Sequence, residues 1–480
     1  MAVGSSNDFD LVVLGAGTGG YTAAFRAAQL GLKVALVDED KIGGTCLHRG
    51  CIPTKALLES AAFTEHVRHA GDYGIKLPGE AEVDYVQMAA RRDQVVKRLW
   101  TGLKSLVDKN KVTWIQGRGR LEGANKIRVS QAGEDGTPGK GGDRVLQATD
   151  VIVATGSRVK SLPGLKPDGK RIVTSDDVLK AEALPKDVIV VGGGAVGVEF
   201  ASMYHDLGTK VTLLEYMPAI VPAEDRDISQ ALERAFTRRG MTVMTNARFD
   251  PAAVSVEKNG VCVTVGPEGK EPQDVRAELL LVAAGRAPNV EEIGLDTTKV
   301  ELDRGFVKVD GRMRTKEPHV YAIGDVVGGL MLAHTAAHEG IVAAHIIAGE
   351  KDVHPVDNVK QPRATYCRPE IASIGLTQQQ CEERDLPIKV GKVPFQAIAK
   401  ALIGGEYDGF AKVIGHKETD ETLGIHLIGP HATDLIAEAS VAFELEASPW
   451  EIGGATHAHP TLSEILGEAA LAVDGRSINF

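Results

Sequence analysis

Cysteine is scarce in this chain, with five among 480 residues. So few cysteines exclude the disulfide framework on which small secreted proteins depend. The opening residues, MAVGSSNDFD, have neither a basic region nor an apolar core and do not predict a secretory signal. We therefore expect a cytoplasmic protein in a reducing compartment.

Long apolar runs and an excess of positive charge are also missing. No apolar stretch reaches the ~18 residues typical of a membrane span. The 65 acidic side chains outnumber the 54 basic ones, and the net charge of −11 argues against nucleic acid or an anionic membrane as the main partner. Aromatic residues make up 5%, whereas 43% hydrophobic and 25% charged residues are ordinary for a soluble protein. The length allows roughly three domains of about 150 residues.

Two of the cysteines, Cys46 and Cys51, lie close together in GGTCLHRGCIPTK, residues 43–55. Five residues of regular helix rise about 7.5 Å, whereas a disulfide needs Cα atoms within about 4.4 to 6.8 Å. A bridge would therefore require a distorted backbone, for which Gly50 and Pro53 are suitable. Two unrelated buried thiols are an equally good interpretation of the spacing. No second Cys or His pair lies at zinc-ligand spacing, so we expect no metal.

A glycine-rich turn lies near the start of the chain, between two apolar runs. The run Asp10–Leu14 leads into GAGTGG, Gly15–Gly20, and a helical pattern and a second strand follow, ending at Asp38. Glycines allow the backbone to approach a pyrophosphate at a helix N-terminus. A carboxylate at the end of the second strand accepts a bond from a ribose hydroxyl. This unit predicts a dinucleotide site.

The same unit recurs in the middle of the chain. Here Asp187–Val191 leads into GGGAVG, Gly192–Gly197, and the second strand ends at Glu215. The first glycine precedes the acidic residue by 23 positions in both units. The chain should therefore bind two dinucleotides. Because a flavin can exchange two electrons with a neighbouring dithiol, we assign FAD to the first unit. At the second, Glu215 favours the free 2′-hydroxyl of NAD, and no arginine follows it until Arg226.

Two apolar runs are expected to be the last strands of the two dinucleotide-binding units. One ends at Gly156, and the other ends at Gly285 and leads into Arg286. A third, VYAIGD, ends in Asp325, which either bonds a ribitol hydroxyl or caps the following helix. The polar stretch 131–143 is expected to be a loop between antiparallel strands.

The pattern changes after about residue 354, where strand-like runs at 371–376, 410–414 and 423–428 precede two helical stretches and HAHPTLSE. In that last segment His459 and Glu464 lie five positions apart, with Pro460 between them. A carboxylate that bonds one imidazole nitrogen makes the other nitrogen a base. Taken alone, His459 would more often be a structural histidine.

Together these motifs resemble the two-dinucleotide-binding flavoprotein disulfide oxidoreductases, and within them the dihydrolipoamide dehydrogenases. The resemblance covers essentially the whole chain, through GAGTGG, GGTCLHRGCIPTK, ATGS, GGGAVGVEF, AIGD, YCRPEIASIGLT and HAHPTLSE. It implies an α/β fold with two Rossmann-like domains, for FAD and NAD, and a C-terminal α+β dimerisation domain. The implied domains are 1–156 for FAD and the disulfide, 157–285 for NAD, 286–353 completing the FAD site, and 354–480 for the interface.

The resemblance also implies a role for each matching residue. Cys46 resembles the thiol that exchanges with lipoamide, and Cys51 the thiol that contacts the flavin. His459, supplied by the other subunit of a homodimer, resembles the base, and Glu464 its orienting partner. Lys55 resembles one half of an ion pair near the flavin. The candidate cofactor-binding residues are Gly15, Gly17, Gly20, Asp38, Lys55, Gly156, Asp325, Gly192, Gly194, Gly197, Glu199, Glu215, Gly285 and Arg286, of which Glu199 is the other half of that pair.

The implied activity is oxidation of dihydrolipoamide, carried on lipoyl domains of acyltransferases, with NAD⁺ as acceptor. The enzyme would serve 2-oxo acid dehydrogenase complexes or glycine cleavage. Alternatives are a glutathione-like disulfide reductase and a mainly docking subunit. Glutathione reductases usually carry two arginines where this chain has Phe25 and Arg26. The pair His48-Arg49 departs from the Asn-Val of many relatives, and we hypothesise that Arg49 lowers a thiolate pKa. Cys367 stands where Thr is common.

Overall fold

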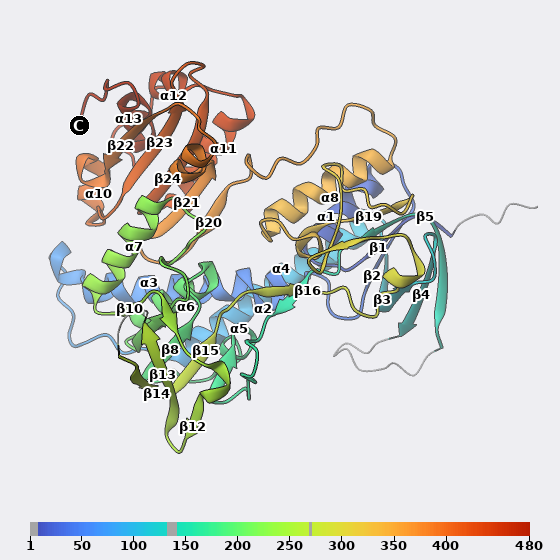
Figure 1. The fold of residues 1–480 in the computed structure, drawn as a ribbon, viewed down its shortest axis with the longest axis horizontal. Coiled ribbons are helices and arrows are strands. Elements are labelled where there is room, and N and C mark those ends of the chain that lie inside the picture. The colour runs from blue at the N-terminus through green and yellow to red at the C-terminus, as the bar shows by residue number, and fades with distance from the viewer. Residues whose placement is uncertain (1–7, 132–141, 268–270) are drawn as a thin grey trace, which may run out of the picture. The chain divides into compact units, whose positions relative to one another are not determined.

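The computed structural model describes residues 8–131, 142–267 and 271–480 (Figure 1). The chain divides into two compact units. The first contains residues 1–56, 90–159 and 286–358, and the second contains residues 57–89, 160–285 and 359–480. None of the helices in the described ranges is both long and apolar enough to cross a membrane.

The first unit is built around a parallel sheet with β1 (Phe9–Leu14) at its centre. The strand order is β3 (Thr113–Leu121), β2 (Val34–Asp38), β1, β5 (Arg144–Val153) and β19 (Val320–Ala322). The antiparallel β4 (Lys126–Gln131) pairs with the extended ends of β3 and β5. The predicted antiparallel insertion is thereby confirmed, while most of its polar loop lies outside the described residues.

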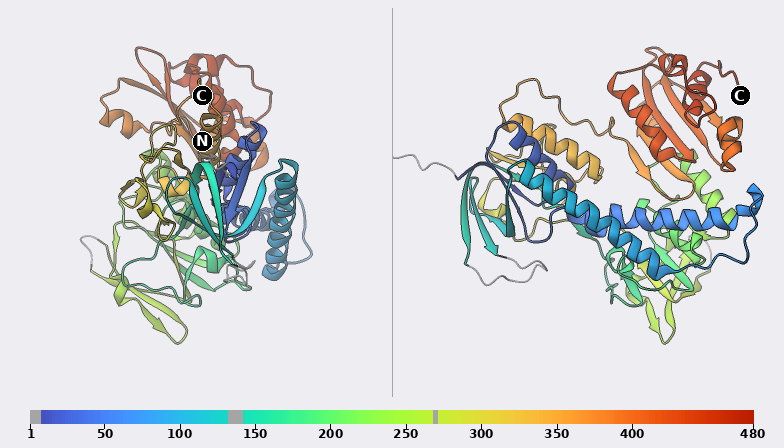
Figure 2. Two further views of the ribbon diagram at one scale, coloured as in Figure 1. Left: turned by 90° about the vertical axis from the view of Figure 1, so that its right-hand side faces the viewer. Right: turned by 180° about the vertical axis from the view of Figure 1, so that it is seen from behind.

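Both faces of this sheet are covered, one by helices and the other by the side of β4, which explains why β1 is apolar on both faces. Leu11 and Val13 pack toward α1 (Thr18–Gln29) and α8 (Ala333–Ile347), whereas Val12 and Leu14 pack on the side of β4. Figure 2 shows α1 and α8 side by side. The other elements of this unit are α2 (Gly44–Arg49), the start of α3 (Cys51–Arg68), most of α4 (Tyr85–Lys109), β6 (Ser157–Val159), β16 (Arg286–Pro288), η3 (Leu295–Thr297), β17 (Leu302–Asp303), β18 (Phe306–Val307) and η4 (Gly324–Val327).

The second unit contains another parallel sheet, with β8 (Asp187–Val191) at its centre. Its order is β10 (Thr242–Met244), β9 (Lys210–Leu214), β8, β15 (Leu279–Val282) and β7 (Ile172–Thr174). Helices α6 (Ala195–Asp206) and α7 (Arg226–Arg239) follow β8 and β9. The smaller elements are η1 (Ala70–Tyr73), α5 (Ser175–Val178), β11 (Ala247–Arg248), η2 (Pro251–Ala253), β12 (Ser255–Glu257), β13 (Gly260–Pro267) and β14 (Gln273–Ala277).

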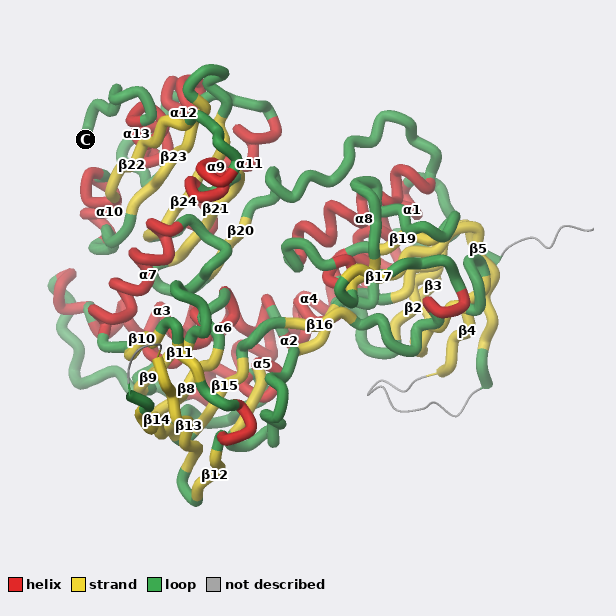
Figure 3. The backbone as a smooth tube through the Cα atoms, viewed as in Figure 1, coloured by secondary structure: helices red, strands yellow, loops and turns green. Residues whose placement is uncertain are grey.

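The C-terminal part of the second unit is an antiparallel sheet with helices (Figure 3). Its strand order is β20 (Arg363–Thr365), β21 (Glu370–Gly375), β24 (Thr422–Gly429), β23 (Phe410–His416) and β22 (Ile388–Pro394). Its helices are α9 (Gln378–Glu383), η5 (Phe395–Ala397), α10 (Ala399–Gly404), α11 (Ala432–Glu444), α12 (Pro449–Gly454) and α13 (Glu464–Ala472). The predicted fold, two dinucleotide-binding sheets followed by an α+β region, is therefore confirmed.

Candidate active site and dinucleotide sites

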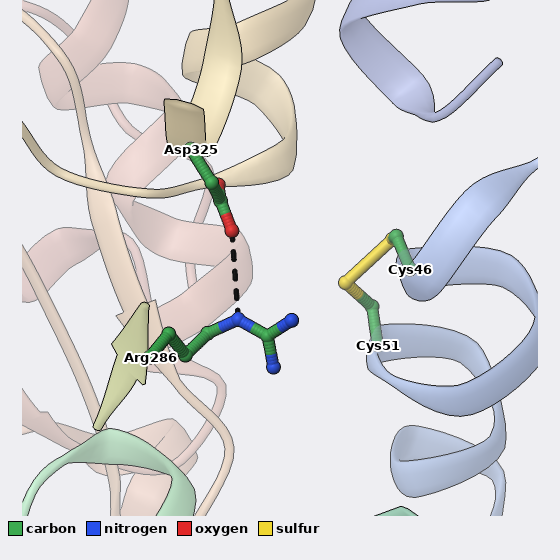
Figure 4. Close-up of a disulfide and its surroundings, with 4 residues drawn as sticks. All are labelled: Cys46, Cys51, Arg286 and Asp325. Carbon is green, nitrogen blue, oxygen red and sulfur yellow. Dashed lines mark ion pairs between the residues drawn. A yellow bond between two sulfur atoms is a disulfide. The ribbon is translucent and has the colours of Figure 1, made fainter. Parts of the chain in front are cut away.

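Cys46 and Cys51 form a disulfide, with their Cα atoms 4.6 Å apart (Figure 4). They lie on two successive helices, α2 and α3, which are separated by Gly50. A Cβ at Gly50 would lie 2.9 Å from the Thr45 carbonyl oxygen, so glycine suits this break. Pro53 instead lies in the first turn of α3, where proline is tolerated. The spacing had left open whether the cysteines pair, and the geometry decides for a disulfide with both residues half-buried.

The disulfide-bearing helix begins directly against the first glycine turn. The Gly43 N–H donates to the Ala16 carbonyl over 2.9 Å. Gly44 has a left-handed φ of 57°, and a Cβ there would lie 2.6 Å from the Cα of Gly17. Such close approach requires glycine at position 44. The backbone thus places the redox pair beside the predicted flavin site.

A polar cluster around Asp325 lies in the same unit as the disulfide (Figure 4). The Asp325 carboxylate accepts a hydrogen bond from Ser157 Oγ and lies 3.5 Å from Arg286 Nε. Arg286 also donates to Ser157, from Nε to Oγ over 2.6 Å and from Nη2 to the carbonyl over 2.7 Å. Asp325 and Arg286 are therefore neighbours, although 39 positions of sequence separate them.

The first glycine turn has the geometry of a phosphate cradle. Gly15 has a φ of +106°, and a Cβ there would overlap the Ala154 carbonyl. A Cβ at Gly20 would overlap the carbonyl of Gly15. At Gly17, by contrast, no described residue lies within 4 Å of the Cβ position, so the space in front of this backbone is open to a ligand. The N-terminus of α1 presents its N–H groups there.

Asp38 closes this turn from the end of β2. Its Oδ2 accepts from Ala16 N over 2.6 Å, and its Oδ1 accepts from Asp40 N over 2.9 Å. Burial raises the pKa of the Asp38 carboxyl, and these two backbone bonds oppose that rise. Each carboxylate oxygen has two lone pairs and can accept a ribose hydroxyl as well. The residues of this turn therefore fit an FAD.

The second glycine turn repeats this geometry in the other unit. Gly192 has a φ of +106°, and a Cβ there would overlap the Ala283 carbonyl; at Gly197 it would overlap the carbonyl of Gly192. No described residue lies within 4 Å of a Cβ position at Gly194. Glu215 accepts from Gly193 N and from Met217 N, each over 2.6 Å. This turn fits a second dinucleotide, and Gly285, with a φ of +109°, follows the neighbouring strand β15.

His459 and Glu464 are brought together by the loop before α13. The imidazole Nδ1 lies 2.9 Å from Glu464 Oε1, and Thr461 N donates to Glu464 Oε2 over 2.9 Å. The pKa of Glu464 is lowered, mostly by the Thr461 backbone bond and then by the bond from His459. With Nδ1 bonded to a carboxylate, Nε2 is the nitrogen that can take a proton. The ring is 73% exposed.

Comparison with known proteins identifies the family. The profile described as "Pyridine nucleotide-disulphide oxidoreductase" matches residues 9–340, and that of the same family's dimerisation domain matches residues 361–470. The chain belongs to the pyridine nucleotide-disulphide oxidoreductase family. Membership confirms the predicted oxidoreductase activity, and FAD and NAD are the cofactors of this family.

Curated relatives of this oxidoreductase match along the full length. The dihydrolipoyl dehydrogenase of Bacillus subtilis is 45% identical over 99% of this chain and 100% of its own. That of Zymomonas mobilis is 42% identical, with the same two coverages. Among solved structures, LpdA from Mycobacterium tuberculosis has a TM-score of 0.87 and 30% identity, covering 96% of this chain and 98% of its own. The HOCl-induced flavoprotein disulfide reductase RclA from Escherichia coli has a TM-score of 0.81 and 25% identity, covering 96% and 99%.

Other predicted features of this oxidoreductase have mixed outcomes. Lys55 and Glu199 fall in different units, so their pairing stays a prediction; within its own unit Glu199 accepts from Tyr366 N over 2.9 Å. The guanidinium of Arg49 pairs with Asp40, over 2.8 Å, and is 45% exposed. A solvated arginine already paired with a carboxylate has little charge left to stabilise a thiolate, which weakens the hypothesis about Arg49.

Sequence reasoning missed a cation beside the second dinucleotide turn. Arg248 lies in β11, and its guanidinium carbon is 5.3 Å from the ring centroid of Tyr216, the residue after Glu215. The backbone connects the two segments, because Ala247 N donates to the Glu215 carbonyl over 2.8 Å. The residues immediately after Glu215 include no arginine before Arg226. A basic residue 33 positions away gave no local signal.

Proposed function

We propose that this enzyme oxidises dihydrolipoamide to lipoamide and reduces NAD⁺ to NADH. One observation carries the proposal: a disulfide, Cys46–Cys51, begins next to the first glycine turn, in a chain 45% identical over its full length to a dihydrolipoyl dehydrogenase. A dithiol substrate can reduce such a disulfide by exchange, without any other redox group on the protein.

The exchange moves two electrons from the substrate dithiol to the cysteine pair. A substrate thiolate attacks Cys46 Sγ, so that a mixed disulfide forms while the Cys46–Cys51 bond breaks and its electron pair remains on Cys51. The second substrate thiol gives its proton to His459 Nε2 and attacks the first substrate sulfur. This step closes the lipoamide disulfide and leaves the electron pair of the mixed disulfide on Cys46. Two electrons have then moved from the substrate to the cysteine pair.

The two glycine turns hold the groups that take these electrons away. Bound FAD supplies a two-electron acceptor that returns a hydride to NAD⁺. Gly15, Gly17, Gly20 and Asp38 would hold the FAD, with Gly156, Arg286 and Asp325 from the same unit. The equivalent residues Gly192, Gly194, Gly197 and Glu215, with Gly285, would hold NAD.

The enzyme works as a homodimer in this proposal, in which His459 and Glu464 of one copy serve the disulfide of the other. The match of residues 361–470 to a dimerisation domain supports pairing of two copies. We assign residues 1–156 to the FAD domain, 157–285 to the NAD domain, 286–353 to a central domain and 354–480 to the interface. Substrate would arrive on lipoyl domains of a 2-oxo acid dehydrogenase complex, and the protein would act in the cytoplasm.

The decisive experiment measures NAD⁺ reduction by dihydrolipoamide beside oxidation of NADPH by glutathione disulfide. We expect rapid NADH formation in the first assay and no turnover in the second. The reverse result would assign the enzyme to the glutathione-like reductases. Cys46→Ser should retain FAD but lose dihydrolipoamide oxidation, whereas Cys262→Ser, which alters a buried free cysteine, should retain both. Activity in Cys46→Ser would contradict the proposed exchange.

A further inference from the structure

A second histidine lies two positions before His459 and is held very differently. The ring of His457 is 12% exposed, against 73% for His459. Its Nε2 lies 2.7 Å from Glu438 Oε1 on α11, and its Nδ1 lies 3.0 Å from the Ala455 carbonyl oxygen. A Cβ at Gly467 on α13 would lie 3.1 Å from the ring. His457 is therefore wedged between two helices with both nitrogens engaged.

The two partners of His457 both accept hydrogen bonds. A carbonyl oxygen and a carboxylate carry no hydrogen to donate, so the imidazole is the donor in either contact. With a hydrogen on Nε2, the ring donates to Glu438 Oε1 over 2.7 Å. A hydrogen bond to a carboxylate is stronger than one between neutral groups.

This hydrogen-bonded pair attaches the loop that carries His459. His459 is largely exposed, so packing around its ring does little to fix its place. Its own bonds lead to Glu464, and Thr461 ties the loop together by donating to Glu464 and, through Oγ1, to the Ala458 carbonyl over 2.7 Å. The His457 ring connects the loop to α11, which is 13 residues long and packs on the sheet.

We propose that the hydrogen-bonded His457–Glu438 pair is a positioning device that holds the 455–463 loop so that His459 can accept the substrate proton. The inference rests on the proposed function, because it assigns His457 a role in the dihydrolipoamide half-reaction only. His457 acts through His459 and does not itself touch the substrate. The neighbouring His457 is also the last of several causes that lower the pKa of Glu464.

The test compares two assays of the dimeric holoenzyme. Dihydrolipoamide oxidation requires His459, whereas reduction of ferricyanide by NADH bypasses the thiol exchange. We expect His457→Gln to lower kcat for dihydrolipoamide about 10- to 100-fold, the size expected when a reacting group is displaced by about 1 Å. NADH–ferricyanide activity should remain at the wild-type level. His431→Gln, which alters a 65% exposed histidine of the same domain, serves as the matched control and should change neither.

Two further variants separate positioning from general structural damage. In a His459→Ala background, His457→Gln should lower the rate of dihydrolipoamide oxidation by less than about twofold further. The effects of two residues that act through one another do not add. Glu438→Gln keeps an acceptor but removes the charge, and should lower only the dihydrolipoamide rate. The inference would be overturned if the rate losses of His457→Gln and His459→Ala multiplied in the double variant. It would also be overturned if His457→Gln or Glu438→Gln lost activity equally in both assays, or kept the wild-type rate of dihydrolipoamide oxidation. A wild-type enzyme that fails to oxidise dihydrolipoamide would instead overturn the proposed function.

Discussion

The two glycine turns of this oxidoreductase contain the same hydrogen bonds, but different segments pack around them. In each, an acidic residue at the end of the second strand accepts a 2.6 Å hydrogen bond from the residue after the first glycine: Ala16 to Asp38, and Gly193 to Glu215. The two turns differ at their fifth residue, counted from the first glycine. Gly19 lies against α8, where a Cβ would be 2.9 Å from the Ala336 carbonyl oxygen. Its counterpart Val196 is 41% exposed.

This difference fits the proposed assignment of FAD to the first turn and NAD to the second. Two further segments pack against the first turn, α8 against Gly19 and α2, through Gly44, against the Cα of Gly17. The first turn of α6 is left open at Val196. Tight enclosure suits the FAD, which stays bound through many cycles, and the open turn suits NAD, which must leave after each one.

The largest expected effects come from matched substitutions of the last glycine in each turn. A side chain at Gly20 or Gly197 would overlap the carbonyl of the first glycine of its own turn. Gly20→Val should yield protein without FAD and without activity. Gly197→Val should retain FAD and lose NADH binding and turnover. Flavin absorbance measures the FAD content of each variant, and NADH titration measures its NADH binding. Loss of FAD from both variants alike would remove the functional distinction between the turns.

The next effect concerns the helix that encloses only the first turn. Glu339 on α8 is 5% exposed and accepts from Gly324 N over 2.6 Å. Burial, aided by the nearby Asp325 charge, raises its pKa from 4.5 to about 7. Because the folded state binds this proton more tightly, the stability it contributes is full below about pH 4.5 and is lost as the pH rises to about 7.

Glu339→Gln should remove this pH dependence. By linkage, wild type loses at most about 3 kcal/mol of its free energy of unfolding over this pH range. The variant should therefore be as stable as wild type near pH 4.5 and more stable above pH 7. Thermal unfolding of both holoenzymes from about pH 4.5 to above pH 7 measures this difference in stability. Glu350→Gln, at an exposed glutamate just after the same helix, should leave the pH profile unchanged. A wild-type profile in Glu339→Gln would show that Glu339 is not the titrating group.

Local spacing predicted those parts of the site that lie within one short segment. The 23-residue interval located Asp38 and Glu215, and the short gap between Cys46 and Cys51 predicted a break that the structure places at Gly50. Contacts between distant segments left no such pattern. The cover of α8 over Gly19 could not be read from the sequence, because the two lie more than 300 positions apart.

A third prediction uses the missed arginine to sharpen the contrast in cofactor choice. Glu215 should repel the 2′-phosphate of NADP, whereas Arg248, beside Tyr216, would attract it. Glu215→Ser should therefore lower the preference for NAD over NADP, in kcat/KM, by about 10- to 100-fold, or about 1.4 to 2.8 kcal/mol. Adding Arg248→Ala should restore part of that preference. An unchanged ratio in Glu215→Ser would show that this carboxylate does not discriminate between the two.

The smallest effect is expected at the open position of the second turn. Val196→Gly removes an exposed side chain from the first turn of α6, so it should lose only helix propensity, at most about 1 kcal/mol. Val196→Ala, the control, should be at least as stable as wild type, since alanine is the better helix former. Thermal unfolding and the KM for NAD⁺ measure both variants. A loss well above 1 kcal/mol with an unchanged KM would mean that Val196 is packed in the working enzyme, and that the second turn is as enclosed as the first.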